Sequence, residues 1–378
     1  DRNPAHRNEL RPFIGMLYEP AARVLDICEA KIPDAPVDTF ADLSANLAKA
    51  GPAHAQLRQG PLQKAYALLI SHGVMITTVR PAYLKLAESG ELAARVSRAW
   101  QRLGDCDLCA RYCRVDRLKT IEGAVCRTGE PAVVHSHGPH HGEEDPLRGW
   151  RGSGTIFFSW CNLRCVYCQN WDTSQKGLGR EVRADELAGM MLDLQARGCH
   201  NINFVSPSHV VAQIIAAVEI AANDGLSLPL VYNTGGYDSL EALELLDGII
   251  DIYMPDMKYG DADMAHRYSH VRNYVEVNRA AVLEMHRQVG DLVLDARGVA
   301  VRGLLVRHLV LPQNLGGTDT MLEFLAEEVS AHTYLNIMNQ YRPCYRANDY
   351  EPLERPITGR EYAQALAWAE AVGLKRLA

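Results

Sequence analysis

Hydrophobic and polar positions follow two different spacings along this chain. From about residue 154, short apolar runs alternate with longer segments whose apolar residues recur every three or four positions. The first spacing is typical of buried strands and the second of amphipathic helices. Strands are predicted at 154–159, 201–206, 229–234, 249–255, 303–312 and 333–339, and helices near 184–197, 208–223, 238–247, 262–289 and 318–330. Because strands that alternate with helices form parallel βαβ units, we predict an α/β fold built as a partial (βα)6 barrel.

The segments around this core have other patterns. Residues 1–104 are rich in Ala, Leu and charge at helical spacing, which predicts an α-helical N-terminal extension. Residues 105–150 lose that spacing and gain Cys, His and Gly, so we expect an irregular, metal-binding segment. The barrel core is predicted over 151–345 and a C-terminal helical tail over 346–378, with Thr358 as the N-cap of its helix.

Composition limits the classes of partner. The chain has 378 residues and a formal net charge of −7, with ordinary globular proportions of 47% hydrophobic and 22% charged residues. We therefore expect no basic face for nucleic acid or anionic membranes, and no apolar run is long enough to span a bilayer. The first residues, DRNPAHRNEL, lack the plan of a secretory signal. Seven of the ten cysteines lie between Cys106 and Cys168, and such clustering favours metal ligation over disulfides.

The clearest chemical motif follows the first predicted strand, in SWCNLRCVYCQNW. Its cysteines, Cys161, Cys165 and Cys168, lie within eight residues. Three thiolates can hold three corners of a cubic iron–sulfur cluster and leave one iron without a protein ligand. A structural zinc site needs four ligands, usually in two short pairs, and fits this spacing poorly. The alternative is a set of buried or zinc-linked cysteines.

A CxxxCxxC motif at the end of the first strand of a (βα)6 unit resembles the radical S-adenosylmethionine (radical SAM) superfamily. The resemblance implies a 4Fe–4S cluster whose open iron binds S-adenosylmethionine (SAM) and cleaves it reductively to a 5′-deoxyadenosyl radical. That radical would abstract hydrogen from a substrate, with the protein positioning the cofactor and excluding water. Tyr167 matches the aromatic residue that the superfamily usually places near the adenine.

Further segments resemble the pyruvate formate-lyase activating-enzyme-like (PflX-type) branch, over about residues 80–350. They are HGEED, RGSGTIFFSWCNLRCVYCQNWDTSQ, VYNTGGYDS, DIYMPDMKYGD, RGLLVRHLVLP and YLNIMNQYRP. The branch's Gly-Gly-Glu type motif, which binds the SAM amino group, is absent after the second strand, where the chain reads NFVSPSHV. Another acceptor is therefore needed, and the candidates are Ser206, Ser208 and His209.

The next two strands carry the remaining cofactor candidates that the resemblance implies. After the third strand, Asn233 and Thr234 would face the cofactor, and Gly235 would allow close backbone approach. After the fourth, Lys258 would pair with the SAM carboxylate and Asp256 would orient it. For each of these polar residues, an ordinary hydrogen bond at the barrel end is the alternative.

Substrate-side candidates come from three places. Arg307 and His308 on the fifth strand, with Asn336 and Gln340 at the sixth, stand where substrate or ribose contacts usually lie. In HSHGPHHGEED, the residues Glu143 and Glu144 suggest a loop that folds over the barrel, although a solvated loop is the alternative. Cys344, after the sixth strand, is a candidate thiol donor at the barrel mouth.

A second cysteine group precedes the barrel with the spacing C-x2-C-x3-C-x12-C. Its members are Cys106, Cys109, Cys113 and Cys126. Four thiolates suit either a closed zinc site or an auxiliary iron–sulfur cluster that relays electrons, and the spacing does not decide between them. Free core cysteines are the third possibility.

Three functions are compatible with these motifs. The first is a radical SAM enzyme acting on a small molecule or peptide, and the second an activating enzyme that removes hydrogen from a glycine of a glycyl-radical enzyme. The third is a non-catalytic iron–sulfur protein for electron transfer or scaffolding. The resemblance implies an electron donor such as flavodoxin or ferredoxin. An oxygen-sensitive cluster implies a reducing compartment, so a cytoplasmic location is expected.

Overall fold

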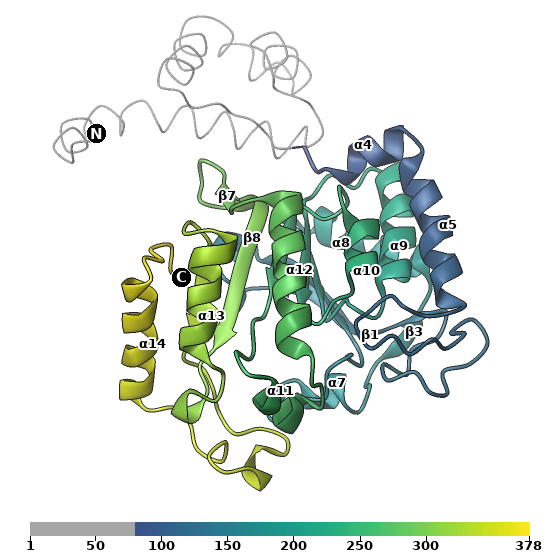
Figure 1. The fold of residues 1–378 in the computed structure, drawn as a ribbon. Coiled ribbons are helices and arrows are strands. Elements are labelled where there is room, and N and C mark those ends of the chain that lie inside the picture. The colour runs from purple at the N-terminus through teal and green to yellow at the C-terminus, as the bar shows by residue number, and fades with distance from the viewer. Residues whose placement is uncertain (1–79) are drawn as a thin grey trace, which may run out of the picture. The chain divides into compact units, whose positions relative to one another are not determined.

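A computed structural model of the chain describes residues 80–378, and most of the predicted N-terminal extension lies outside them. The described part is one compact unit, Arg80–Ala378, built around a single sheet (Figure 1). Six of its strands pair in parallel in chain order: β2 (Ser153–Phe158), β4 (Ile202–Val205), β5 (Leu230–Thr234), β6 (Ile252–Pro255), β8 (Ala300–Leu309) and β9 (Tyr334–Met338). The predicted α/β fold with a mostly parallel sheet is confirmed.

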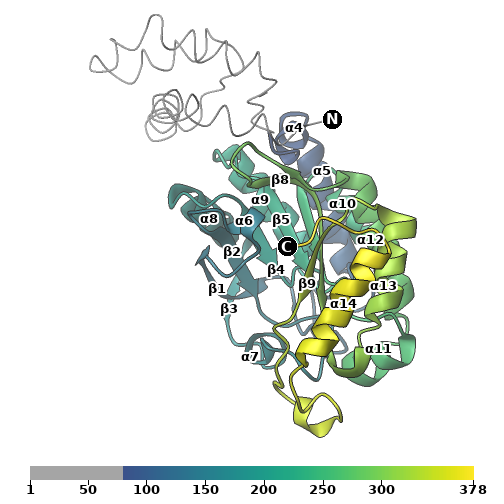
Figure 2. The same cartoon turned by 90° about the vertical axis from the view of Figure 1, so that its left-hand side faces the viewer.

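Helices cover one face of this sheet (Figures 1 and 2). They are α8 (Ala184–Ala196), α9 (Val211–Asn223), α10 (Leu240–Leu246), α11 (Ala262–Ser269), α12 (Tyr274–Val289) and α13 (Thr318–Phe324), which continues as a π-helical turn, η3 (Leu325–Val329). Successive strand residues face opposite sides. Leu230 and Tyr232 accordingly join the core under the helices, whereas Val231 faces a smaller inner cluster with Ile252. Because these helices cover the other face, side chains on the inner face of the sheet can form a site.

The helices α4 (Tyr83–Glu88) and α5 (Glu91–Leu103) belong to the same unit as the sheet. Leu92, Ala99 and Leu103 of α5 are fully buried, and α5 packs against α9. Because α9 thus has neighbours on several sides, nearly all its residues are buried, as its apolar sequence requires. The predicted extension, 1–104, therefore ends in two helices that are part of the core.

The segment 105–150 is not irregular throughout, as the sequence had suggested. It contains β1 (Ala132–His140), which pairs antiparallel with β2 and with β3 (Arg180–Val182), and a short helix, α6 (Asp145–Arg148). Without β1, the outer edge of β2 would carry unpaired backbone groups, so the tertiary need for a partner outweighs the weak strand pattern of HSHGPH. The histidines of this stretch lie on or beside a strand and not in a free loop.

The C-terminal tail is helical only in part. Its helix, α14 (Gly359–Ala371), begins at the predicted cap, because the Thr358 hydroxyl accepts from the Glu361 amide at 3.2 Å and the Glu361 carboxylate accepts from the Thr358 amide at 2.7 Å. The last residues then return to the sheet, where the Leu335 amide donates to the Arg376 carbonyl at 2.9 Å. The shorter elements are α7 (Trp171–Ser174), β7 (Val293–Leu294), η2 (Pro312–Asn314) and η4 (Ala347–Asp349).

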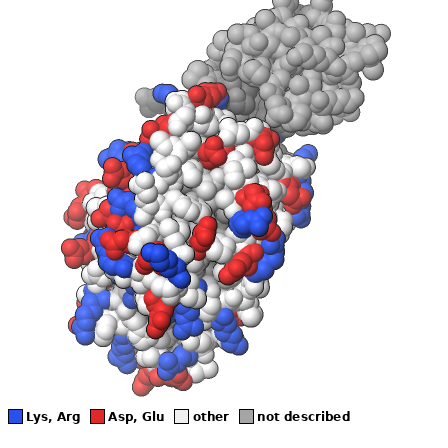
Figure 3. Space-filling model, turned by 90° about the vertical axis from the view of Figure 1, so that its right-hand side faces the viewer, with Lys and Arg blue, Asp and Glu red and all other residues white. Residues whose placement is uncertain are grey.

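Surface charge on the described residues is mixed. Figure 3 shows acidic and basic side chains interspersed on one face, without a large area of a single sign. Searching residues 80–378 finds no helix with the length and apolar character that a membrane crossing requires.

Candidate functional site

The loop after β2 carries Cys161, Cys165 and Cys168, here called the cysteine loop (residues 161–168), and it is anchored from several directions. The Val166 amide donates to the Tyr268 carbonyl at 2.8 Å, and the Arg346 amide donates to the Val166 carbonyl at 2.9 Å. The Asn162 side chain donates to the Tyr237 carbonyl at 2.6 Å. These partners come from segments far apart in sequence, so the tertiary fold fixes the course of the loop.

The three thiols lie close enough to influence one another. Burial raises the pKa of Cys161 to about 12 and that of Cys168 to about 11, and the neighbouring thiols raise both further. The ammonium of Lys258 lowers both values, which places its positive charge beside the loop. Free thiols at these positions are protonated, so any metal centre that binds them must displace the protons.

The arrangement of these sulfurs bears on the kind of metal centre that they could hold. Across residues 80–378, no three His, Cys, Asp or Glu side chains are arranged to hold one metal ion. The ligands of a cubane each bind a different iron, so they need not converge as tightly as those of a lone zinc. The three thiols influence one another and lie beside Lys258, and thiolates are the ligand type that a 4Fe–4S cluster uses.

A line of charged side chains leads away from the cysteine loop. The Lys258 ammonium donates to Asp256 Oδ2 at 2.6 Å, and Arg307 Nε donates to Asp256 Oδ1 at 3.0 Å. Arg307 Nη2 then donates to the Asn233 amide oxygen at 2.7 Å. Although burial raises the pKa of Asp256, Arg307 and Lys258 more than offset this and hold it below its ordinary value. Asp256 is therefore a carboxylate that fixes both cations.

Two glycines after β5 let the backbone approach this line. A Cβ at Gly235 would lie 3.0 Å from Leu163 Cδ1 of the cysteine loop and 3.6 Å from Lys258 Cε. Gly236 has φ +74°, and a Cβ there would lie 2.2 Å from the Asp256 carbonyl oxygen. Gly235 therefore brings the end of β5 close to the cysteine loop, and its predicted approach to the cofactor stays a prediction.

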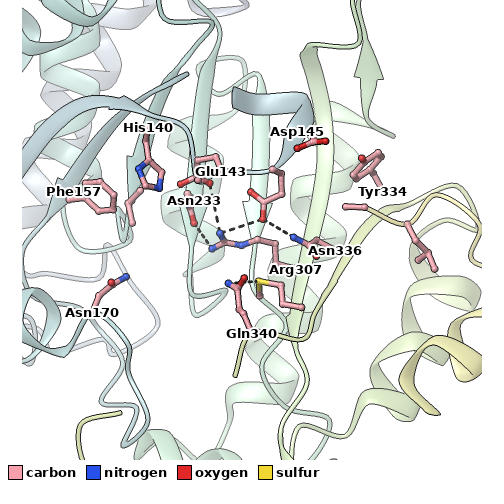
Figure 4. A pocket seen from close by; sticks show the side chains of 16 residues that line it. His140, Glu143, Asp145, Phe157, Asn170, Asn233, Arg307, Tyr334, Asn336 and Gln340 are labelled. Carbon is pink, nitrogen blue, oxygen red and sulfur yellow. Dashed lines mark hydrogen bonds and ion pairs between the residues drawn. The ribbon is translucent and has the colours of Figure 1, made fainter. Parts of the chain in front are cut away.

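The charged line ends at a cavity of about 720 Å³ on the inner face of the sheet (Figure 4). Glu143 and Glu144 reach it from the segment after β1, and Arg307 Nη1 lies 4.0 Å from Glu143 Oε2 and 3.7 Å from Glu144 Oε1. The Asn336 amide donates to Glu144 Oε1 at 3.1 Å. The structure therefore brings Glu143, Glu144, Asn233, Arg307, Asn336 and Gln340 together around one space.

Three of the predicted cofactor residues point elsewhere. The Ser208 hydroxyl lies 2.9 Å from that of Thr234, which also donates to Asp238 Oδ2 at 2.7 Å. His209 is buried, with Nε2 3.0 Å from the Ser159 carbonyl oxygen. None of these residues lines the cavity. Ser208, Thr234 and His209 Nε2 make buried contacts within the protein, whereas His209 Nδ1 is buried without a hydrogen-bond partner.

His308 is also turned away from the cavity. Its Nδ1 lies 2.6 Å from the Met257 carbonyl oxygen and its Nε2 2.8 Å from the Thr318 hydroxyl. Burial lowers its pKa to about 4, so the ring is neutral. Adjacent residues on a strand face opposite sides, so only one of Arg307 and His308 can line the cavity, and the one that does is Arg307.

The remaining candidates lie near the site without lining the main cavity. Tyr167 packs in a buried tyrosine cluster, with its ring centroid 6.4 Å from that of Tyr259 and 6.1 Å from that of Tyr341. Ser206 lines a smaller cavity of about 250 Å³ that shares Asn170 with the main one. Cys344 is half-buried in the turn that supports the cysteine loop.

The second cysteine group forms a separate cluster around a buried arginine. Cys106, Cys109 and Cys126 are buried, and the pKa of Cys109 is raised by burial and by the other thiols of the group. Arg117, 2% exposed, lies with Nη1 3.5 Å from Cys106 Sγ, and its Nε donates to the Thr128 carbonyl at 2.7 Å. Within residues 80–378 it forms no ion pair with a carboxylate.

The two cysteine groups are linked through their loops. Arg111 Nε donates to the Asn162 carbonyl at 2.6 Å, and Arg164 of the cysteine loop donates to the Val125 carbonyl. The thiols of Cys161 and Cys126 both act on the Arg164 guanidinium, so the two groups are near neighbours.

Several lining residues were not predicted from the sequence. They are His140, Phe157, Asn170, Val205, Tyr334, Met338 and Leu377. Phe157 and Val205 lie at the carboxyl ends of their strands on the inward-facing register, a signal that alternation alone could have supplied. Asn170 and His140 had no comparable signal, because they lie beyond regular strand pairing or on an unpredicted strand.

Comparison with known proteins shows which family part of the chain is similar to. Residues 155–312 match the family model of the radical SAM superfamily. The Methanocaldococcus jannaschii protein MJ0674 is 28% identical over 299 residues, which cover 77% of this chain and 82% of that protein.

Two solved structures are also similar. A radical SAM methyltransferase from Sphaerobacter thermophilus has a TM-score of 0.43 and 14% identity, over 78% of this chain and 90% of its own. Streptococcus suis SuiB bound to its precursor peptide SuiA has a TM-score of 0.37 and 11% identity, over 56% and 45%. The family match covers β2, the cysteine loop and the strands that carry Asp256 and Arg307. The matched part of the chain is therefore similar to the radical SAM superfamily, a family that uses S-adenosylmethionine and a 4Fe–4S cluster.

Proposed function

We propose that this protein is a radical SAM enzyme that abstracts hydrogen from a small-molecule or peptide substrate held in the 720 Å³ cavity. The observation that carries the proposal is the line of charged side chains, Lys258, Asp256 and Arg307, which runs from beside the cysteine loop to the cavity. That line joins the predicted cluster site to the space where a substrate would bind. The finer placement in the pyruvate formate-lyase activating-enzyme-like branch is part of this proposal.

The chain's own residues have separate tasks in this scheme. Cys161, Cys165 and Cys168 would hold three irons of the cluster. When bound, the cluster and SAM together supply a one-electron cleavage that yields a hydrogen-abstracting 5′-deoxyadenosyl radical. Lys258, kept charged by Asp256, presents a cation to the carboxylate of SAM.

Buried aromatic residues around the loop exclude water from this chemistry. Tyr167, Tyr259 and Tyr274 are fully or almost fully buried beside the cysteine loop. A dry surrounding strengthens the charge interactions of Lys258 and protects a reactive radical from side reactions. A reducing cytoplasmic location and a donor such as flavodoxin or ferredoxin complete the proposal.

The second cysteine group is proposed to bind a metal of its own. The buried Arg117 supports this, because its Nη1 lies 3.5 Å from Cys106 Sγ and its charge interacts with the thiols of Cys106, Cys109 and Cys126. Zinc and an auxiliary iron–sulfur cluster both remain compatible with four cysteines.

The test uses the full chain, purified and reconstituted without oxygen, with dithionite as reductant and SAM as substrate. We expect wild type to form 5′-deoxyadenosine and Cys165→Ala to form roughly 100-fold less, since loss of one thiolate ligand destabilises the cluster. Cys199→Ala, which removes a buried cysteine far from the loop, is the matched control. Thermal unfolding shows that both variants fold. Equal product from wild type and Cys165→Ala would refute the proposal.

A further inference from the structure

Glu143 and Glu144, here called the carboxylate pair, are held in an unusual state beside the cavity. Their side chains are only 7% and 6% exposed. Oε2 of each is buried and has no hydrogen-bond partner. A buried carboxylate oxygen without a donor costs free energy, so the pair is built to receive one.

The nearby cations, Arg307 and Lys258, do not donate hydrogen bonds to the carboxylate pair. Arg307 donates its Nε to Asp256 and its Nη2 to Asn233, and its Nη1 reaches the pair only at 3.7 and 4.0 Å, too far for hydrogen bonds. Lys258 is paired with Asp256. Three carboxylates thus share two cations, so one negative charge at the pair has no cation of its own.

A proton can balance this charge. Burial and the adjacent Glu144 raise the pKa of Glu143 to about 7, while Arg307 opposes the shift. Near neutral pH the pair therefore holds a proton between two carboxyl groups, as closely spaced carboxylates do. A ligand cation that donates hydrogen bonds could take the place of that proton.

The rest of the lining disfavours an acidic ligand. Among the residues that line the cavity, Arg307 is the one Lys or Arg side chain. Its donors already serve Asp256 and Asn233, so a phosphate or carboxylate would meet the carboxylate pair without a cation to bind it. The other polar lining groups include the amides of Asn170, Asn233, Asn336 and Gln340, which suit neutral polar atoms.

We propose that the cavity recognises its substrate through a basic nitrogen, a primary ammonium or a guanidinium, which Glu143 and Glu144 bind together. This inference rests on the proposed function, because it names the substrate class of the same site. The ammonium group of SAM has the same chemistry, so the experiment must separate the two sources.

The experiment is calorimetric titration of the anaerobic, reconstituted full chain. The probes are the α-amides of N-acetyl-lysine, N-acetyl-norleucine and N-acetyl-glutamic acid, which are cationic, neutral and anionic at similar size. They are titrated into protein saturated with SAM, and SAM is titrated separately. The variants are Glu143→Gln, Glu144→Gln and, as matched control, Glu181→Gln on the exposed surface of β3.

We expect the lysine probe to bind wild type about tenfold or more tightly than the norleucine probe, as charge-assisted hydrogen bonds provide, and the glutamate probe to bind weakest. Glu143→Gln and Glu144→Gln should each remove this difference between the lysine and norleucine probes. In each variant, the fall in affinity for the lysine probe should be about tenfold larger than the fall in affinity for SAM. Glu181→Gln should behave as wild type. Unchanged far-ultraviolet circular dichroism shows that the variants fold.

Two results would overturn the inference. One is equal affinity for the lysine and norleucine probes. The other is a larger loss for SAM than for the lysine probe in the pair variants, which would assign the pair to the cofactor. In either case, 5′-deoxyadenosine formed by wild type but not by Cys165→Ala would leave the proposed function standing, so the two failures are distinguishable.

Discussion

The two cysteine groups use the same residue type in different surroundings. The cysteine loop lies beside Lys258, whose partner Asp256 leads through Arg307 to an open cavity. The four-cysteine group encloses the buried Arg117, and none of its cysteines lines that cavity. The difference teaches that the surroundings, more than the sulfurs, distinguish the two groups, because one lies beside a charged line that leads to a cavity and the other beside a buried cation.

The largest expected effect comes from breaking the charged line. Asp256→Asn would leave Lys258 and Arg307 buried without their shared carboxylate, and breaking such a buried pair costs about 3–5 kcal/mol. We expect SAM affinity to fall by roughly 100-fold and the melting temperature to drop, measured by equilibrium binding and thermal unfolding. Asp263→Asn, on the exposed surface of α11, serves as control. Unaltered SAM affinity would show that the line does not serve the cofactor.

The second prediction concerns the four-cysteine group. In a variant whose loop cysteines Cys161, Cys165 and Cys168 are all alanine, we expect a bound metal that Cys109→Ser removes to about a tenth or less, because a closed four-thiolate site needs every ligand. Elemental analysis identifies the metal as zinc or iron. Arg117→Met should weaken retention less, since it removes a compensating charge but no ligand.

Neither zinc nor iron in the variant without loop cysteines would rule out a second metal site. The two groups would then differ in kind, and the four buried thiols would be part of the core alone.

The smallest expected effect is a pH dependence at the carboxylate pair. The raised pKa of Glu143 means that the pair keeps a proton at low pH, and a cation binds the form that has lost it. Affinity for the lysine probe should therefore rise by several-fold to about tenfold from pH 6 to pH 8 and then level off. Calorimetry at fixed ionic strength measures this, and Glu143→Gln should flatten the profile.

Other titratable groups face the same space. Glu144, Arg307 and Asp256 adjoin Glu143, and His140 of β1 and Asp145 line the cavity. The variant His140→Gln removes the imidazole and so distinguishes any contribution of His140 to the pH dependence from that of Glu143. A flat profile in wild type, or one abolished by His140→Gln and kept by Glu143→Gln, would contradict the assignment.

Much of the fold followed from local patterns. Short apolar runs predicted each of the six parallel strands to within a few residues, because a strand that is buried in the sheet needs such a run whatever its partners are. Strand β1 escaped prediction because its polar residues become a strand only where the edge of β2 needs a partner. The cysteine motif was also recognisable, since its spacing is a local property.

The direction of individual side chains was harder to predict. Arg307 and His308 are neighbours on β8 with similar polarity, yet one lines the cavity and the other bonds to Met257 and Thr318. Ser208 and Thr234 satisfy each other in the interior. Choosing between such residues requires knowing which face of the sheet the helices cover.

The sequence by itself therefore determined the order of strands and helices, the Cys161–Cys168 motif and the resemblance of that motif to the radical SAM superfamily. Only the tertiary structure decided that Glu144 meets Asn336, 192 residues away, and that both share a cavity with Arg307. The physical reason is that periodicity and ligand spacing act over a few residues. Contacts across the inner face depend instead on how parallel strands bring distant segments to one edge of the sheet.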